Sequence, residues 1–182
     1  MRCGAIFATA ALMAACTQIA RVDNQIALIA DAPFVVNGRL SAHHGDDALS
    51  ASFDWRHRSD GDAIALLSPL GQTLAKLARD GGRVSITLAD GRQASAGTFD
   101  ALTAQAFGVP LPVSGLTSWI RGHPHGGSTF AIERDAAGRA DVLRQDGWEI
   151  VYSYADDGSR LPRRLRLAYP DVDMRIIIDQ WQ

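Results

Sequence analysis

An alternation of apolar and polar residues with a period of two constrains the fold of this chain more than any other feature. In residues 48–55, ALSASFDW, every second side chain is apolar and the ones between are small or polar. This pattern is typical of an antiparallel strand with one face on a core and the other in water. Comparable runs recur along the chain, as FVVNGRLSA, DAIALLS, QTLAKLAR, RVSITLAD, RQASAGT, STFAIERD, ADVLRQDG, WEIVYSYAD, LPRRLRLAYP and VDMRIIIDQW.

Turn signals separate these runs. SDGD, RDGG and ADGR stand between alternating segments, and Asp-Gly in that setting is a strong hairpin signal. We therefore expect one up-and-down antiparallel sheet of about ten or eleven strands, which is large enough to curl.

Two short helical segments interrupt the strands in the middle of the chain. TFDALTAQAFG offers Thr98 as an N-cap, and LPVSGLTSWIRG follows Pro112. A curled sheet covers its apolar concave face either by closing into a barrel or by using helices as a lid. We expect a mainly β, α+β fold in which an incomplete barrel carries a helical lid over a hydrophobic cavity.

Such a cavity suits a hydrophobic ligand. Seven apolar side chains are candidates to line it, although the pattern does not separate lining from plain core. They are Phe53, Trp55, Leu66, Trp119, Trp148, Ile150 and Tyr152.

The N-terminus has the pattern of an export signal. Met1 and Arg2 precede the apolar stretch 4–15, and small residues lead to Cys16. The stretch is too short to span a membrane as a mature helix. We expect a lipoprotein signal peptide over residues 1–15, a lipidated Cys16 with a tether and short helix over 16–32, and one domain over 33–182. The segment before Cys16 resembles the lipobox of bacterial lipoproteins, which favours leucine three places before the cysteine. Because Met13 stands there, an ordinary secretory signal with a chance cysteine is the alternative.

Composition narrows the functional classes. The 182 residues are 47% hydrophobic and 21% charged, with a net charge of −2. This composition is globular, and the charge gives no reason to expect nucleic acid as a partner. Catalytic and nucleotide-binding motifs are missing from the sequence, so we expect neither an enzyme nor a cofactor.

Clusters of histidine and arginine are the remaining candidate site residues. His123 and His125 lie around a proline in a glycine-rich segment, and His43 and His44 lie in a turn; neither pair has enough nearby ligands for a metal site. Four arginines follow in SRLPRRLR, of which three could form a basic rim toward lipid phosphates or an acidic partner. A solvated strand face is the favoured interpretation. The rim candidates are Arg163, Arg164 and Arg166, with Arg160 beside them.

The segment LLSPLGQTLAKL contains an apolar residue in a turn. Pro69 and Gly71 are ordinary turn residues, whereas Leu70 occupies a position that usually faces water. From the residues alone, packing of this side chain on Leu67 or Leu74 is the simpler expectation.

Together these motifs resemble the LolB family of outer-membrane lipoprotein receptors, within the LolA/LolB lipoprotein-sorting group. The resemblance rests on the spaced PLG turn, on GVPLPVSGLTSWIRGHP, on LRQDGWEIVYSY, and on FVVNGRLSA, SFDWRH, LPRRLRL and MRIIIDQW. It implies a half-barrel that takes lipoproteins from the periplasmic carrier LolA and inserts them into the inner leaflet of the outer membrane. It also implies a lipid-anchored monomer on the periplasmic face, with no covalent step and no nucleotide.

For the PLG turn, the resemblance implies that Pro69, Leu70 and Gly71 form a protruding loop whose exposed leucine passes cargo to membrane phospholipid. Thr17, after the cysteine, is not the aspartate that resembles an inner-membrane retention signal. Two other functional classes stay open: a non-carrier outer-membrane lipoprotein that acts as a β scaffold in envelope assembly, and an enzyme that acts on lipid.

Overall fold

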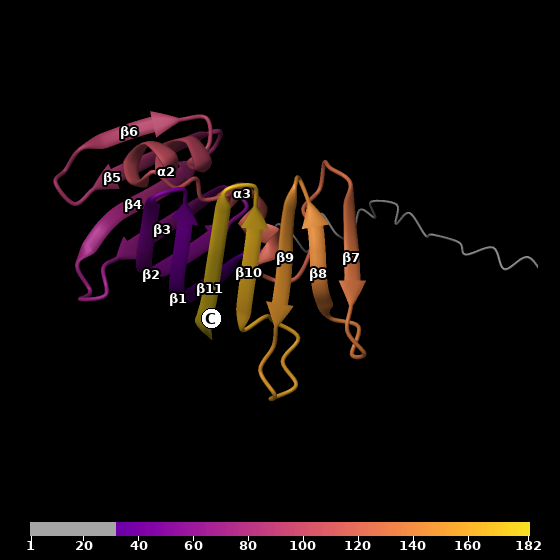
Figure 1. The fold of residues 1–182 in the computed structure, drawn as a ribbon. Coiled ribbons are helices and arrows are strands. Elements are labelled where there is room, and N and C mark those ends of the chain that lie inside the picture. Colours follow the sequence, from indigo (N-terminus) through magenta and orange to yellow (C-terminus); the bar gives the residue numbers. More distant parts are fainter. Residues whose placement is uncertain (1–31) are drawn as a thin grey trace, which may run out of the picture.

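The computed structural model describes residues 32–182, which form an open antiparallel sheet of eleven strands with two helices (Figure 1). The elements in chain order are β1 Phe34–His44, β2 Asp47–Arg58, β3 Gly61–Leu67, β4 Thr73–Asp80, β5 Arg83–Leu88, β6 Gln93–Ala96, α2 Phe99–Phe107, α3 Val113–Trp119, β7 Phe130–Arg134, β8 Ala140–Gln145, β9 Trp148–Ser153, β10 Arg164–Tyr169 and β11 Val172–Trp181.

The strand order shows that the sheet is open. It runs β6-β5-β4-β3-β2-β1-β11-β10-β9-β8-β7, so nearly all neighbours in the sheet are also neighbours in sequence. The last strand returns to pair with the first, while β6 and β7 form the two outer edges. The predicted curled antiparallel sheet with helices is confirmed.

Burial follows the predicted period of two. In β2 the side chains of Leu49, Ala51, Phe53 and Trp55 are buried, and in β11 the buried positions begin at Val172 and likewise repeat every second residue. Alternate side chains of a strand point to opposite faces, so one face of the sheet carries the core.

Close backbone approach fixes one glycine in the first strand. The register of β1 shifts between Asn37 and Gly38, which marks a bulge. A Cβ atom at Gly38 would lie 2.2 Å from the carbonyl oxygen of Ile177. Only glycine fits here, and bulges of this kind increase the local twist of a sheet.

Both helices lie between the two sheet edges in sequence. Thr98 caps α2 as predicted, because its Oγ1 accepts a hydrogen bond of 3.3 Å from the backbone N–H of Ala101. The helix ends at Gly108, whose φ of 72° is left-handed. Helix α2 packs against β5 and β6 (Figure 1), and α3 follows directly after Pro112.

The predicted signal peptide, Cys16 and most of the predicted tether and helix lie outside the described residues. Within residues 32–182, neither helix is long and apolar enough to cross a membrane.

Candidate functional site

An entirely apolar cavity lies between the sheet and the segment around α3. Strands β1, β2, β3, β4 and β11 supply one wall. Residues 111–120, which include α3 and which we call the lid, supply the other. Its free space is small, about 30 Å³, which is room for one or two water-sized molecules. The lining residues are Leu40, Phe53, Trp55, Ile64, Leu66, Leu77, Leu111, Val113, Leu116, Ile120, Met174 and Ile176.

Local structure explains how the two walls meet. Phe53 and Trp55 are two residues apart on β2 and therefore share its concave face. On the opposite side, Val113, Leu116 and Ile120 follow the three- and four-residue spacing that places side chains on one face of a helix. All of these side chains are buried.

The predicted cavity residues separate into three groups. Phe53, Trp55 and Leu66 line the cavity. Trp119 and Trp148 line a different groove on the far side of α3. Ile150 and Tyr152 are buried in the core and line neither space. Burial raises the pKa of the Tyr152 hydroxyl above its ordinary value.

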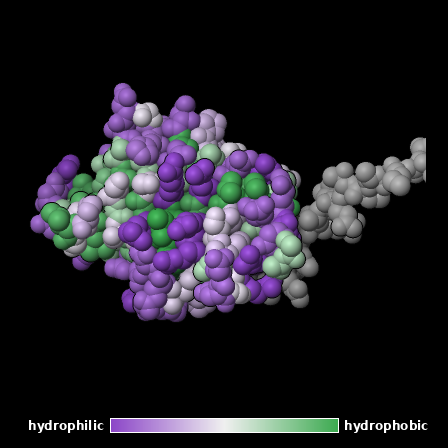
Figure 2. Space-filling view, turned by 60° about the horizontal axis from the view of Figure 1, so that its bottom comes forward, coloured by the Kyte–Doolittle hydropathy of each residue, from purple (hydrophilic) through white to green (hydrophobic). Residues whose placement is uncertain are grey.

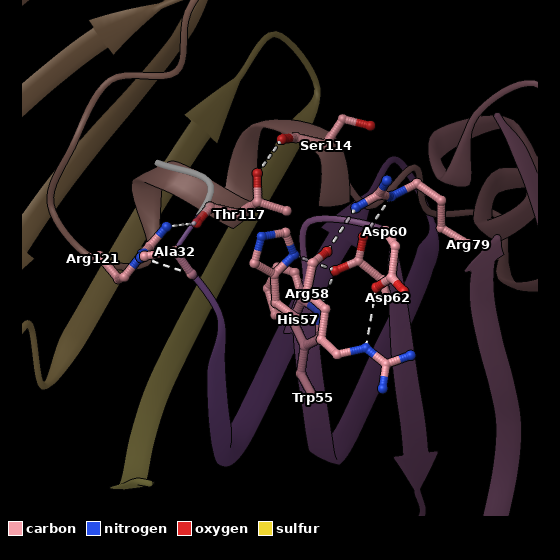
Figure 3. Close-up of polar contacts among 10 residues, drawn as sticks. All are labelled: Ala32, Trp55, His57, Arg58, Asp60, Asp62, Arg79, Ser114, Thr117 and Arg121. Carbon is pink, nitrogen blue, oxygen red and sulfur yellow. Dashed lines mark hydrogen bonds and ion pairs between the residues drawn. The ribbon is translucent and has the colours of Figure 1, made fainter. Parts of the chain in front are cut away.

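A buried polar cluster holds Trp55 in the cavity wall (Figure 3). The indole Nε1 of Trp55 donates to Asp62 Oδ1 over 2.9 Å, and His57 Nδ1 lies 2.7 Å from the same oxygen. The guanidinium Nε of Arg79 donates to Asp62 Oδ2 over 2.7 Å. With both carboxylate oxygens engaged, Asp62 fixes the orientation of the indole ring.

The charge on Asp62 follows from this geometry. Burial by itself raises the pKa of the Asp62 carboxyl, but hydrogen bonds from His57, Trp55 and Arg79 act in the opposite direction and outweigh it. The pKa of Asp62 therefore lies below its usual value, and the side chain is ionised at neutral pH. A carboxylate buried in this way is stable only because it is hydrogen-bonded on every side.

The turn between β3 and β4 holds Leu70 in water. Gly71 N–H donates to Ser68 O over 2.8 Å, and Ser68 N–H donates to Gln72 O over 2.7 Å. Gly71 has a φ of 80°, the left-handed conformation that glycine adopts without strain. At 88% exposure, Leu70 does not pack on Leu67 or Leu74.

Exposure of this degree is unusual for the molecule. The other large hydrophobic residues classed as exposed in the described range reach only 36–43%. Figure 2 shows a surface that is mostly hydrophilic, with small hydrophobic areas between charged and polar residues. Isolated exposed leucines are common on proteins, but this one stands at the tip of a hydrogen-bonded turn.

The arginines near β10 lie on the outer face of the sheet. Arg164 and Arg166 are exposed, whereas Leu165 between them is buried. Arg163 Nη2 lies 3.6 Å from Asp179 Oδ1, which also pairs with Arg39 at 2.9 Å. Arg160 is exposed in the preceding loop. This placement supports a solvated face, and the basic rim stays a prediction.

Two of the histidines weighed as metal ligands make other contacts. His125 Nε2 lies 2.5 Å from Asp146 Oδ2, and His44 Nδ1 lies 2.9 Å from the carbonyl oxygen of Gly108. In the part of the chain that the structure describes, no three His, Cys, Asp or Glu side chains gather as metal ligands.

Comparison with known proteins places this geometry in a family. The model of the family described as outer membrane lipoprotein LolB matches residues 32–181. The chain belongs to the LolB family. An outer-membrane lipoprotein LolB from Chromobacterium violaceum is 39% identical over 180 residues, covering 97% of each chain. One from Nitrosomonas europaea is 37% identical over 158 residues, covering 85% of this chain and 74% of its own.

Solved structures show the same fold. A LolA superfamily protein from Nitrosomonas europaea superposes with a TM-score of 0.53 at 11% identity, covering 90% of this chain and 94% of its own. LolB family membership confirms the resemblance, and with it an outer-membrane lipoprotein that serves lipoprotein localisation and is not an enzyme.

Sequence reasoning missed most of the lid side of the cavity. Leu111, Val113 and Leu116 line it, whereas the sequence analysis predicts only Trp119 from the lid side. The helical spacing of Val113, Leu116 and Ile120 was the available signal. Their large apolar side chains share one face, whereas Trp119 lines a different groove.

Proposed function

We propose that this chain accepts lipoproteins from a LolA-type periplasmic carrier, holds their acyl chains in the apolar cavity beneath α3, and inserts them into the inner leaflet of the outer membrane. The observation that carries the proposal is Leu70, an 88% exposed leucine on a rigid turn. A turn that serves only to connect two strands has no need of an apolar tip.

Leu70 is suited to disturbing lipid and not to anchoring the protein. Complete burial of a leucine side chain contributes about 1.5–3 kcal/mol, which is too little for stable attachment. The hydrogen bonds of Ser68 and Gly71 keep the turn in one shape, so the side chain enters the interface without further ordering. It then provides an apolar path for the leading acyl chain.

The cavity has to open before it accepts an acyl chain. Its free space of about 30 Å³ is far below the roughly 300–1,000 Å³ of typical ligand pockets. Helix α3 is the movable wall: it has seven residues, and its N-cap Pro112 makes no side-chain hydrogen bond. Lifting of α3 would expose the apolar floor formed by Phe53, Trp55 and Leu66.

Transfer needs no energy source in this scheme. A difference of about 1.4 kcal/mol between carrier and receptor biases the acyl chain tenfold toward the receptor. Release is then favourable, because each methylene buried in the bilayer contributes about 0.8 kcal/mol.

The chain acts as a monomer tethered by a lipidated Cys16 on the periplasmic face. One acyl chain anchors a protein only marginally, whereas two or more hold it stably. A multiply acylated Cys16 would therefore keep the domain beside the phospholipid that receives the cargo.

A fluorescent fatty acid distinguishes this carrier from a β scaffold in envelope assembly. The carrier binds it saturably, and excess unlabelled fatty acid displaces it. A scaffold with a filled core gives no saturable signal at any concentration below the micelle threshold, and that result would refute the cavity.

A further inference from the structure

A second concave site lies on the side of α3 that faces away from the cavity. It is a groove with a volume of about 620 Å³ between the starts of α2 and α3 and the turns at the ends of β8 and β10. We call it the aromatic groove, and its principal lining residues are Asp100, Trp119, His125, Asp146, Trp148 and Tyr169.

The glycine-rich segment around His125 and the turn between β8 and β9, neither of which lines the cavity, meet in this groove. Gln145, which is 3% exposed, accepts hydrogen bonds from the indole Nε1 of Trp119 at 2.9 Å and from the backbone N–H of His125 at 3.0 Å. Its amide Nε2 donates to His125 O at 2.8 Å and to Ser128 Oγ at 3.0 Å. Every polar atom of this amide is engaged, so the groove wall is preformed.

Aromatic rings form the floor. Trp148 and Tyr169 stack with ring centroids 5.1 Å apart, and Trp119 lies 6.2 Å from Trp148 and 5.6 Å from His125. Ring faces carry a negative quadrupole and attract cations such as lysine ammonium and arginine guanidinium.

Two carboxylates flank the rings. Asp146 occupies the left-handed first position of the Asp-Gly turn, with a φ of 52°, and reaches His125. Asp100 is half-buried in the first turn of α2, and burial raises the pKa of its carboxyl. Within residues 32–182 the structure gives this carboxyl no cationic partner. The groove lining there contains neither lysine nor arginine.

We propose that the aromatic groove binds a lysine or arginine side chain presented by an extended segment of a partner protein. The cation would lie over Trp148 and Tyr169 and beside Asp100 and Asp146. A volume of about 620 Å³ is large for a bare ion and suits a long side chain with its flanking backbone. The groove lies away from the Leu70 turn, since four strands separate β3 from β9 in the sheet, and it shares helix α3 with the cavity.

A peptide fits this groove better than a lipid headgroup. In a zwitterionic ethanolamine headgroup, a phosphate lies only two carbons from the ammonium. The carboxylates of Asp100 and Asp146 would repel that phosphate, and the groove lining has no lysine or arginine to compensate. Lysine and arginine bring the cation without an anion.

Titration of the full chain with short glycine–serine peptides tests the proposal. One peptide carries a single central arginine and its partner carries norleucine, and the shifts of the tryptophan indole N–H resonances report binding. We expect saturable binding of the arginine peptide only. Asp100→Asn and Asp146→Asn should each weaken it by roughly fivefold or more. Asp156→Asn, an exposed carboxylate in the β9–β10 loop, should stay within about twofold.

Equal binding of the two peptides, or none, would overturn the proposal. Tighter binding of soluble glycerophosphoethanolamine would overturn it in favour of a lipid headgroup. Thermal unfolding verifies that each variant is folded, and Asp100→Asn should not lower the midpoint because it removes a partly desolvated charge. If a variant fails to fold, the salt dependence of arginine-peptide binding to the unaltered chain is the second test. Higher salt should weaken this binding, and salt-independent binding would contradict the charge argument.

Discussion

At the scale of single residues, Asp62 links folding to the cavity. Its carboxylate joins Trp55 of the cavity wall to His57 and Arg79. None of this could be predicted from the sequence, because a buried aspartate within DGDA looks like an ordinary turn residue. The burial of Phe53 and Trp55 could be predicted, because alternation with a period of two is recognised from residues that are close in sequence.

Replacing Asp62 with asparagine should lower the free energy of unfolding by about 3 kcal/mol at pH 7, because Arg79 and His57 lose the charge that they surround. Urea unfolding of the variant and the unaltered protein measures this difference. Asp54→Asn, at an exposed position of the neighbouring strand β2, is the control and should change stability by less than about 0.5 kcal/mol.

The comparison of Asp62→Asn with the unaltered protein should also depend on pH. The pKa of Asp62 is lowered in the folded protein, so its contribution is present above the unfolded aspartate pKa of about 3.9 and is lost as the pH falls through the folded value. The stability difference between Asp62→Asn and the unaltered chain should therefore hold at neutral pH and shrink in acid below about pH 4. A difference that grows on acidification would show that the carboxylate is not the stabilising species.

At the scale of elements, strands were predictable and the lid was only partly so. Alternation located every strand of the described sheet, and Thr98 with Gly108 bounded α2 as capping rules require. Trp119 was expected in the cavity, but it lines the separate groove and its indole donates a hydrogen bond to Gln145. That partner lies 26 positions away, beyond the reach of local pattern.

Trimming the lid should separate stability from ligand uptake. Leu116→Ala removes a lining side chain of α3 and should cost about 2–4 kcal/mol of stability, while fluorescent fatty acid binds at least as tightly because the lid opens more easily. Leu143→Ala removes a fully buried leucine that does not line the cavity. It should cost a similar amount without tightening binding. Weaker binding to Leu116→Ala than to Leu143→Ala would show that α3 is not the movable wall.

At the scale of the whole molecule, pairing of β1 with β11 joins the two ends of the domain, and β6 and β7 stay as free edges. The number of strands predicted a curled sheet. Its closure by α3 to a cavity of about 30 Å³ could not be predicted, since packing density depends on side chains from five strands and the lid together. Family membership supplies the outer-membrane placement.

Membrane attachment belongs to the N-terminal cysteine in this account. Cys16→Ser should move the exported protein from the membrane fraction to the soluble envelope fraction, because a single inserted leucine contributes only about 1.5–3 kcal/mol. Acyl-chain binding should survive, since the cavity is formed within residues 32–182. Fractionation followed by immunoblotting measures the first effect. Retention in the membrane fraction would show that another part of the chain anchors it.

The most direct test of the handover changes Leu70 to glutamate and measures two steps separately, uptake of a lipoprotein from the carrier and its release into liposomes. Leu161→Glu, at a leucine that is 36% exposed in another loop, is the control. The account predicts normal uptake, an unchanged unfolding midpoint and lost release for Leu70→Glu, with both steps normal in the control. Normal release by Leu70→Glu would contradict it, and loss of both steps together with thermal stability would make Leu70 a structural residue.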